Sequence, residues 1–121
     1  YNSSKKPELW INTSEAEIQP ALSPTYEISK RLIGQLVSLR WNNLNENERK
    51  SLIIRKLIIG PFRSDLNPLG IISADLVASQ IIKQVGFKLR LIIISPNPIT
   101  RIHYRVFRHV QKRHVVWCRV D

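Results

Sequence analysis

Behind Ser23-Pro24, apolar residues recur at the spacing of a single helix face. Serine is a favoured helix cap and proline a favoured first helical residue, so this pair predicts the start of a helix. The apolar stripe that we expect to be buried consists of Ile28, Leu32, Ile33, Leu36, Val37 and Leu39. Lys30, Arg31 and Arg40 fall on the opposite face, which we expect to contact water.

Two further helices are predicted before residue 87. Asn45 followed by Glu48 has the spacing of a capping box, and Gly60-Pro61 is a strong stop signal, so a second helix is expected between them, with Lys56 facing water. Asn67-Pro68 starts a third helix, which a glycine ends at position 86. The stripes expected to face the core are Leu52, Ile53, Leu57 and Ile58 in the second helix and Ile71, Ala74, Ala78, Ile82 and Val85 in the third.

After residue 86 the apolar period changes from helical to alternating, which predicts short strands. Alternation runs over 87–93 and again over 102–106, with a proline-containing turn between, and 115–120 is a last strand rich in β-branched residues. Helices followed by a meander predict an α+β fold, with an N-terminal helical subdomain packed on a small, mostly antiparallel C-terminal sheet.

A single domain is expected over residues 1–121. Its first part, 1–22, is polar, contains two prolines and shows no sustained period, so we interpret it as a tail or arm. The helical subdomain then covers 23–86, and the sheet subdomain, which carries a basic patch, covers 87–121.

Composition and charge point to a polyanionic partner. The 121 residues are 43% hydrophobic, which excludes wholesale disorder, and their formal net charge is +10. Residues 83–121 carry nine of the 19 Lys and Arg but only one acid, and such a cluster attracts anions. A single cysteine, Cys118, excludes an intrachain disulfide and favours a reducing compartment, while no apolar run reaches the length of a membrane helix.

Catalytic and metal-binding spacings are absent from the sequence. The downstream acids are scattered, there is no glycine-rich phosphate loop, and no histidine has an evident orienting partner. The potential zinc ligands lack the short spacings of zinc modules; they are His103, His109, His114 and Cys118. We therefore expect a protein that is not an enzyme, with no catalytic residue, metal or cofactor.

The basic third of the chain predicts a phosphate-binding surface. On a strand, Arg101, His103 and Arg105 share one face, and Lys88 and Arg90 can join them from the neighbouring strand. Further cations follow at the next turn: Arg108, Lys112 and Arg113. Such groups bind phosphates and release counterions. Because no aromatic box for stacking on single-stranded bases is evident, the pattern favours double-stranded RNA, which is recognised through its backbone.

The order of these segments resembles the C-terminal interferon-inhibitory domain of the filovirus polymerase cofactor. The strings PTYEISKRL and RSDLNPLGIISADLVAS resemble that domain's first helix start and its third helix. Ile102-His103-x-Arg105, Arg108-x-x-Gln111-Lys112 and the segment around Trp117 resemble its basic patch and following strand. The glycine- and aromatic-rich link between the first two helices and the proline-rich loop of that family are missing here, as in a diverged or endogenised copy.

The resemblance implies a domain that shields viral double-stranded RNA and antagonises host interferon induction in the host cell cytosol. The nucleic-acid-binding residues would then be Arg101, Arg105, Arg108, Lys112 and Arg113. A second basic patch would consist of Lys30, Arg31 and Arg63, and its partners would be viral nucleoprotein or polymerase, with host RNA sensors or their activators as further partners. No membrane partner is expected.

Two alternatives remain open at this point. One is a viral matrix-type protein whose basic face binds anionic membrane, since basic residues alone do not distinguish lipid phosphate from RNA phosphate. The other is a small basic ribonucleoprotein subunit, since such chains are short and cationic.

Overall fold

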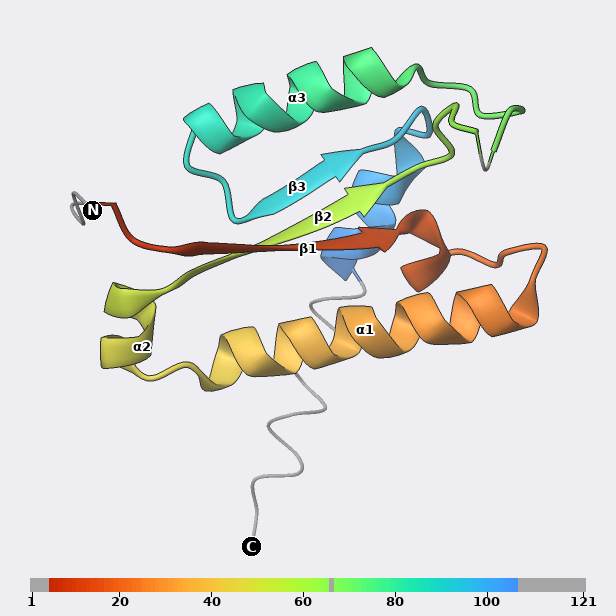
Figure 1. Ribbon diagram of the computed structural model, residues 1–121. Coiled ribbons are helices and arrows are strands. Elements are labelled where there is room, and N and C mark those ends of the chain that lie inside the picture. Colours follow the sequence, from red (N-terminus) through yellow and green to blue (C-terminus); the bar gives the residue numbers. More distant parts are fainter. Residues whose placement is uncertain (1–4, 66, 107–121) are drawn as a thin grey trace, which may run out of the picture.

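The computed structural model describes residues 5–65 and 67–106, which form a three-stranded sheet with helices on both faces (Figure 1). The elements in chain order are β1 (Glu8–Ser14), the 3-10 helix η1 (Glu15–Glu17), α1 (Pro24–Asn43), α2 (Glu46–Ser51), β2 (Ile53–Ile59), α3 (Ala74–Gly86) and β3 (Leu91–Ile94). Residues 99–106 are again helical.

The sheet is parallel throughout and has the order β1-β2-β3. The predicted α+β fold with a helical N-terminal subdomain and an antiparallel C-terminal sheet is therefore wrong. One strand comes from each of the three ranges 1–22, 23–86 and 87–121, so the sheet crosses both expected boundaries. The prediction of a single domain over the whole chain stays a prediction.

The central strand β2 was predicted to be the end of a helix. The capping box of Asn45 and Glu48 is present, but it starts only the six-residue α2. The following residues form β2, which is buried on both faces from Ile54 to Ile59. A central parallel strand is a nearly continuous apolar run, and a run of this kind also fits helical spacing, which explains the error.

The side chains of β2 alternate between two cores. Leu57 and Ile59 face α3 and pack with Val77, whereas Ile54 faces α1 and packs with Val37. Helices α1 and α3 thus cover opposite faces of the sheet, as Figure 1 shows.

The two connections between the parallel strands have opposite hands. Both step in the same direction across the sheet, from β1 to β2 and from β2 to β3. Because α1 and α3 lie on opposite faces, one of these crossovers must be left-handed, an uncommon arrangement. The 99–106 helix packs against β2 and β3 through Tyr104, which contacts Ile58 and Ile93.

Helix α1 begins where predicted, with Ser23 as its cap and Pro24 in its first turn, but its buried face is the opposite of the predicted one. Gly34 and Val37 are its buried residues. The expected buried stripe is exposed, with Ile28 at 66%, Leu32 at 57%, Leu36 at 56%, Leu39 at 44% and Ile33 at 38%; of that stripe only Val37 is buried. The reason is that the sheet presents a charged group to this helix, so a glycine and polar side chains pack against it.

That charged group is a buried ion pair between Lys56 of β2 and Glu17 of η1. The Lys56 ammonium, expected to face water, is fully buried and donates to the Glu17 carboxylate, to the Gly34 carbonyl (3.0 Å) and to the Ser38 hydroxyl (3.2 Å). The Thr13 hydroxyl donates to the other Glu17 oxygen at 2.9 Å. The pair therefore connects β1, β2 and α1 and fixes the helix over the sheet.

The remaining predicted elements are partly displaced. Helix α3 ends at Gly86 as predicted, but it starts at Ala74 after the cap Ser73 and not at Asn67-Pro68. Residues 60–65 and 67–73 form a loop with short bridges, and Val77 is the buried residue of the helix. Of the expected strand 87–93, only the end belongs to β3. Residues 102–106 are helical instead of extended, and the strand predicted over 115–120 lies outside the described residues.

A second ion pair closes the opposite end of the sheet. Arg55 binds Glu8 through two hydrogen bonds of 2.9 and 2.8 Å, and the Trp10 indole also donates to Glu8 at 2.8 Å. The Arg55 hydrogen bonds, followed by the Trp10 bond, lower the pKa of the Glu8 carboxyl to about 2. This pair connects β1 to β2 at their amino ends.

Candidate functional site

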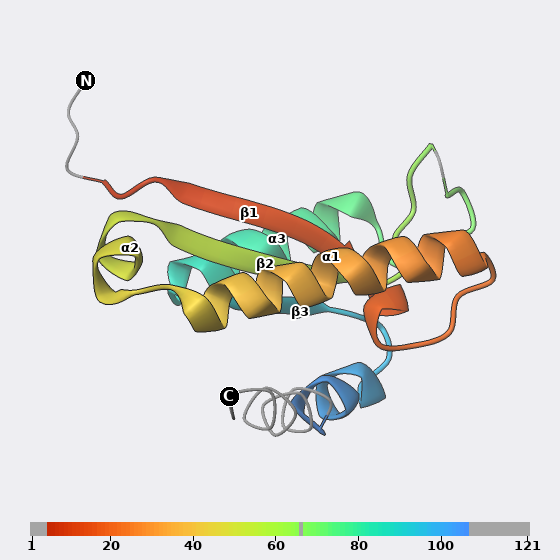
Figure 2. The same ribbon diagram turned by 90° about the horizontal axis from the view of Figure 1, so that it is seen from below.

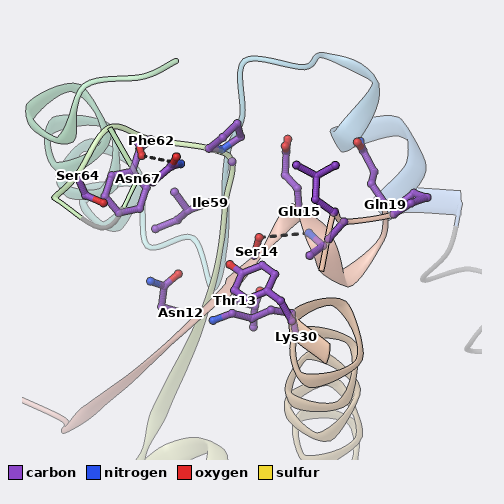
Figure 3. Close-up of a pocket in the computed structure, with 17 residues that line it drawn as sticks. Asn12, Thr13, Ser14, Glu15, Gln19, Lys30, Ile59, Phe62, Ser64 and Asn67 are labelled. Atoms are coloured by element: carbon purple, nitrogen blue, oxygen red, sulfur yellow. Dashed lines mark hydrogen bonds between the residues drawn. The ribbon is translucent and has the colours of Figure 1, made fainter. Parts of the chain in front are cut away.

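A cavity of about 680 Å³ opens at the carboxyl ends of β1 and β2. Parallel α/β sheets bind their ligands at this edge, because the loops that leave the strands diverge there. The volume is within the usual range for a small-molecule site. Figure 3 shows its walls: Lys30 comes from α1, Asn12 and Ser14 come from β1, and Phe62, Ser64 and Asn67 come from the loop after β2.

Helix α1 brings a tyrosine and a lysine to this cavity. Tyr26 and Lys30 are four residues apart, so they lie on one face of the helix, and both line the cavity. The Lys30 ammonium lies over the Tyr26 ring, 5.4 Å from its centroid. Among the described residues no carboxylate forms a salt bridge with Lys30, so its charge acts on the ring and on the cavity.

The end of β1 adds a serine hydroxyl beside this pair. Ser14 is the last residue of β1 and caps η1, accepting a hydrogen bond from the Ala16 N–H at 3.2 Å (Figure 3). Because this bond uses an oxygen lone pair, the hydroxyl hydrogen remains available to a ligand in the cavity. Together the three side chains offer a phenol, an ammonium and an alcohol to one bound molecule.

Glu15, which follows Ser14, has a structural role at the same edge. Its carboxylate accepts hydrogen bonds from Ser95, just after β3, and from Thr100 at 2.7 Å. Gly60 leaves room for it, since a Cβ there would lie 3.2 Å from that carboxylate and 2.9 Å from Pro96. These contacts hold the carboxyl ends of the strands together below the cavity.

The loop after β2 forms the opposite wall. Ser64 and Asn67 exchange backbone hydrogen bonds of 3.1 and 3.0 Å, and the Asn67 amide donates to the Phe62 carbonyl at 3.3 Å. The loop thus presents polar groups over a folded turn, next to the Phe62 ring.

The residues predicted to bind nucleic acid are only partly described. Arg101 and Arg105 are exposed and lie one turn apart in the 99–106 helix, so they share a helix face and not the predicted strand face, which included His103. Both arginines line a separate cavity of about 410 Å³ beside β3. Arg108, Lys112 and Arg113 lie outside the described residues.

The three members of the predicted second patch have different surroundings. Lys30 is half-buried in the cavity, whereas Arg31 forms a salt bridge of 2.8 Å with Glu27. Arg63 is exposed in the loop after β2. Neither Arg31 nor Arg63 lines the cavity that contains Lys30.

Sequence reasoning missed Tyr26 and Ser14. A tyrosine and a lysine spaced four apart in the first turns of a predicted helix are a usable signal, because helical spacing places them side by side. Ser14 carries no such signal, since it belongs to a segment interpreted as an arm.

Across residues 5–65 and 67–106, no three His, Cys, Asp or Glu gather as metal ligands, and no helix is both long and apolar enough for a membrane span. His109, His114 and Cys118 lie outside that part of the chain.

Comparison with known proteins gives one informative relative. No protein-family model matches the chain, and no solved structure matches it. The chain is 50% identical over 99 residues to a monoglucosyldiacylglycerol epimerase of Synechocystis sp.. The match covers 82% of this chain and 23% of the relative, so the chain spans about a quarter of that protein's length.

This similarity overturns the resemblance to the filovirus polymerase cofactor. The relative is named as an epimerase of a glycolipid, so the predictions of an interferon antagonist, of double-stranded RNA and viral or host-sensor partners, and of a protein that is not an enzyme are wrong. The matched strings misled because they are short, and short strings of common residues recur by chance in unrelated proteins. The expected absence of a membrane partner stays a prediction, because the relative's name bears only on the RNA and viral partners. A cytosolic location stays a prediction.

Proposed function

We propose that this chain forms the acid–base side of an epimerase site that inverts a hydroxyl-bearing carbon in the sugar headgroup of a glycolipid. The observation that carries the proposal is the Tyr26–Lys30 pair, which lines a cavity at the carboxyl end of a parallel sheet. The similarity to a protein named for monoglucosyldiacylglycerol epimerisation supports the substrate class.

Tyr26 is the group placed to move the hydroxyl proton. Inversion at such a carbon passes through a carbonyl, so the O–H proton must leave and later return. A tyrosine phenolate can take this proton, and the resulting phenol can give it back when the alcohol re-forms with the opposite configuration. Tyr26 is 46% exposed on the cavity wall, so a ligand can reach it.

Lys30 makes this exchange easier. A positive charge beside the phenol stabilises the negative charge that develops on its oxygen during proton transfer, and the Lys30 ammonium lies over the Tyr26 ring. Ser14 can donate its hydroxyl hydrogen to the substrate oxygen and so hold that oxygen in place during both proton transfers.

The hydrogen on carbon would leave as a hydride, and a bound redox cofactor would supply its acceptor, because no amino-acid side chain accepts a hydride. The cavity lies at the sheet edge where parallel sheets hold such groups. Lys30, with three N–H donors, and Asn12 would be the side chains that hold it.

The test is Tyr26→Phe in the protein that carries this chain, assayed by NMR for conversion of monoglucosyldiacylglycerol into its epimer. Removing the proton-carrying group should lower the rate at least about 100-fold. Tyr104→Phe is the matched control, since Tyr104 is buried away from this cavity, and it should change the rate by less than a few-fold. Retention of a tenth or more of the activity in Tyr26→Phe would refute the assignment.

The role of Lys30 is tested by the rate of the same reaction at one fixed pH. Lys30→Met should lower the rate at least about 10-fold, because the negative charge that develops on the Tyr26 oxygen loses its positive neighbour. Lys30→Arg should keep most of the parent's rate, since it keeps the charge.

A further inference from the structure

Two leucines in the loops around the cavity are unusually open to water. Leu22 is fully exposed and Leu69 is 90% exposed, which makes them the two most exposed large apolar side chains of the described residues. Ile71, in the same loop as Leu69, is 72% exposed. Isolated exposed leucines are common, but two at this level beside one cavity call for an explanation.

Both leucines belong to loops that leave the same edge of the sheet. Leu22 lies between η1 and α1, after β1, and itself lines the cavity. Leu69 lies in the loop between β2 and α3, whose residues Ser64 and Asn67 form the opposite wall. Figures 1 and 2 show both loops projecting at the end toward which the strands run, with α2 at the far end. The loops that carry the two leucines thus form opposite walls of the cavity.

The two loop segments around the entrance have no net charge. Residues 18–23 contain no charged side chain, and residues 60–73 contain Arg63 and Asp65, whose charges cancel. This differs from the strongly positive last third of the chain. A neutral apolar rim fits the surface of an uncharged glycolipid bilayer better than it fits a polyanion or an acidic protein.

We propose that this rim inserts Leu22 and Leu69 into the boundary between headgroups and acyl chains, so that a diacylglycerol lipid can present its sugar to Tyr26 without leaving the bilayer. The inference rests on the proposed function for its substrate, a lipid whose sugar must reach the cavity while its chains stay in an apolar medium. Apolar side chains bind to interfaces in proportion to the area that they bury.

The first test places an environment-sensitive NBD dye at Leu22→Cys or Leu69→Cys, in a Cys118→Ser background, with vesicles of phosphatidylcholine and monoglucosyldiacylglycerol. Each probe should show a blue shift and brighter emission when vesicles are added. The control is Asn47→Cys on α2, which is exposed at the opposite end and should show no change. An equal response at all three positions, or none at either leucine, would overturn the proposal.

The second test measures co-sedimentation with the same vesicles. Leu22→Ser and Leu69→Ser should each weaken binding about tenfold, and the double variant about 100-fold. Leu36→Ser, on the exposed face of α1, is the matched control and should bind like the parent. A loss in Leu36→Ser equal to that of the rim variants would assign the contact to α1 and reject the rim.

Two further outcomes separate this inference from its alternatives. Blue-shifted NBD emission before lipid is added, increasing with protein concentration, would mean that a second copy covers the leucines, and would overturn the proposal. Tyr26→Phe should bind vesicles like the parent even though it loses activity, so a failure of the acid–base assignment and a failure of membrane docking give different results.

Discussion

Replacing Lys56 with methionine should remove much of the stability of this fold. The Lys56 side chain is fully buried in the central strand, and Glu17, which accepts its hydrogen bond, is only 4% exposed. Methionine has a similar length, so the substitution removes the charge with little change in volume. Glu17 then keeps its negative charge away from water, with the Thr13 hydroxyl as a neutral donor.

The magnitude follows from the cost of an uncompensated buried charge. Removing one partner of a buried pair typically lowers the free energy of unfolding by about 3–5 kcal/mol. Domains of this size have a total free energy of unfolding of about 5–15 kcal/mol. The variant should therefore be close to unfolding at room temperature or lose about 10–20 °C in its melting temperature. The Gly34 carbonyl and the Ser38 hydroxyl also lose a donor, which adds to the effect.

The assay is urea unfolding followed by circular dichroism, with two matched variants. Lys50→Met removes an exposed lysine on α2 and should change the free energy of unfolding by less than about 0.5 kcal/mol. Adding Glu17→Gln to Lys56→Met neutralises the remaining charge and should recover at least about 1 kcal/mol. If Lys56→Met stays within 1 kcal/mol of the parent, or if the double variant is less stable than the single one, the buried-pair argument is wrong.

Three further predictions concern the same framework. The pKa of Glu8 is about 2 in the folded chain against 4.5 for the free group, so its pairing with Arg55 should stabilise the fold above pH 4.5 and lose this effect as the pH falls toward 2. Because Glu8 is partly open to water, Glu8→Gln should reduce the pH-dependent part of the free energy of unfolding by only about 1 kcal/mol, as measured in acid titrations. Gly34→Ala, normally favourable in a helix by about 1 kcal/mol, should instead lower the melting temperature because its Cβ would collide with the Glu17 carboxylate, and a rise would contradict the close packing. Ile72→Asp, which buries a carboxylate against the α3 core, should prevent cooperative melting, whereas a melt like that of the parent would show that Ile72 is not buried.

Local signals along the chain predicted where several elements begin and end. Ser23-Pro24 starts α1, Asn45 with Glu48 starts α2, and Gly86 ends α3, because capping depends on the residues next to the helix end. The same signals could not assign the type of the element that follows. After α2 the chain enters β2 instead of continuing as a helix, and its five apolar residues, which flank Arg55 and Lys56, fit both periods.

The candidate site could be inferred only in part, because its members come from separate segments. The spacing of Tyr26 and Lys30 was visible in the sequence, yet its meaning depends on the cavity that β1 and the loop after β2 complete. The basic residues that dominate the composition gave a misleading picture, since Arg101 and Arg105 lie on a helix beside β3 and not beside the cavity at the ends of β1 and β2.

By itself, the sequence determined the helix starts, the strongly positive last third and the side-by-side placement of Tyr26 and Lys30, since these depend on neighbours within a few residues. Only the tertiary structure decided that the sheet is parallel, that the polar face of α1 is the buried one, and that Ser14 reaches the cavity. The physical reason is the buried Lys56–Glu17 pair: residues 39 positions apart in the chain compensate each other's charge, and this reverses the face that hydrophobicity alone would bury.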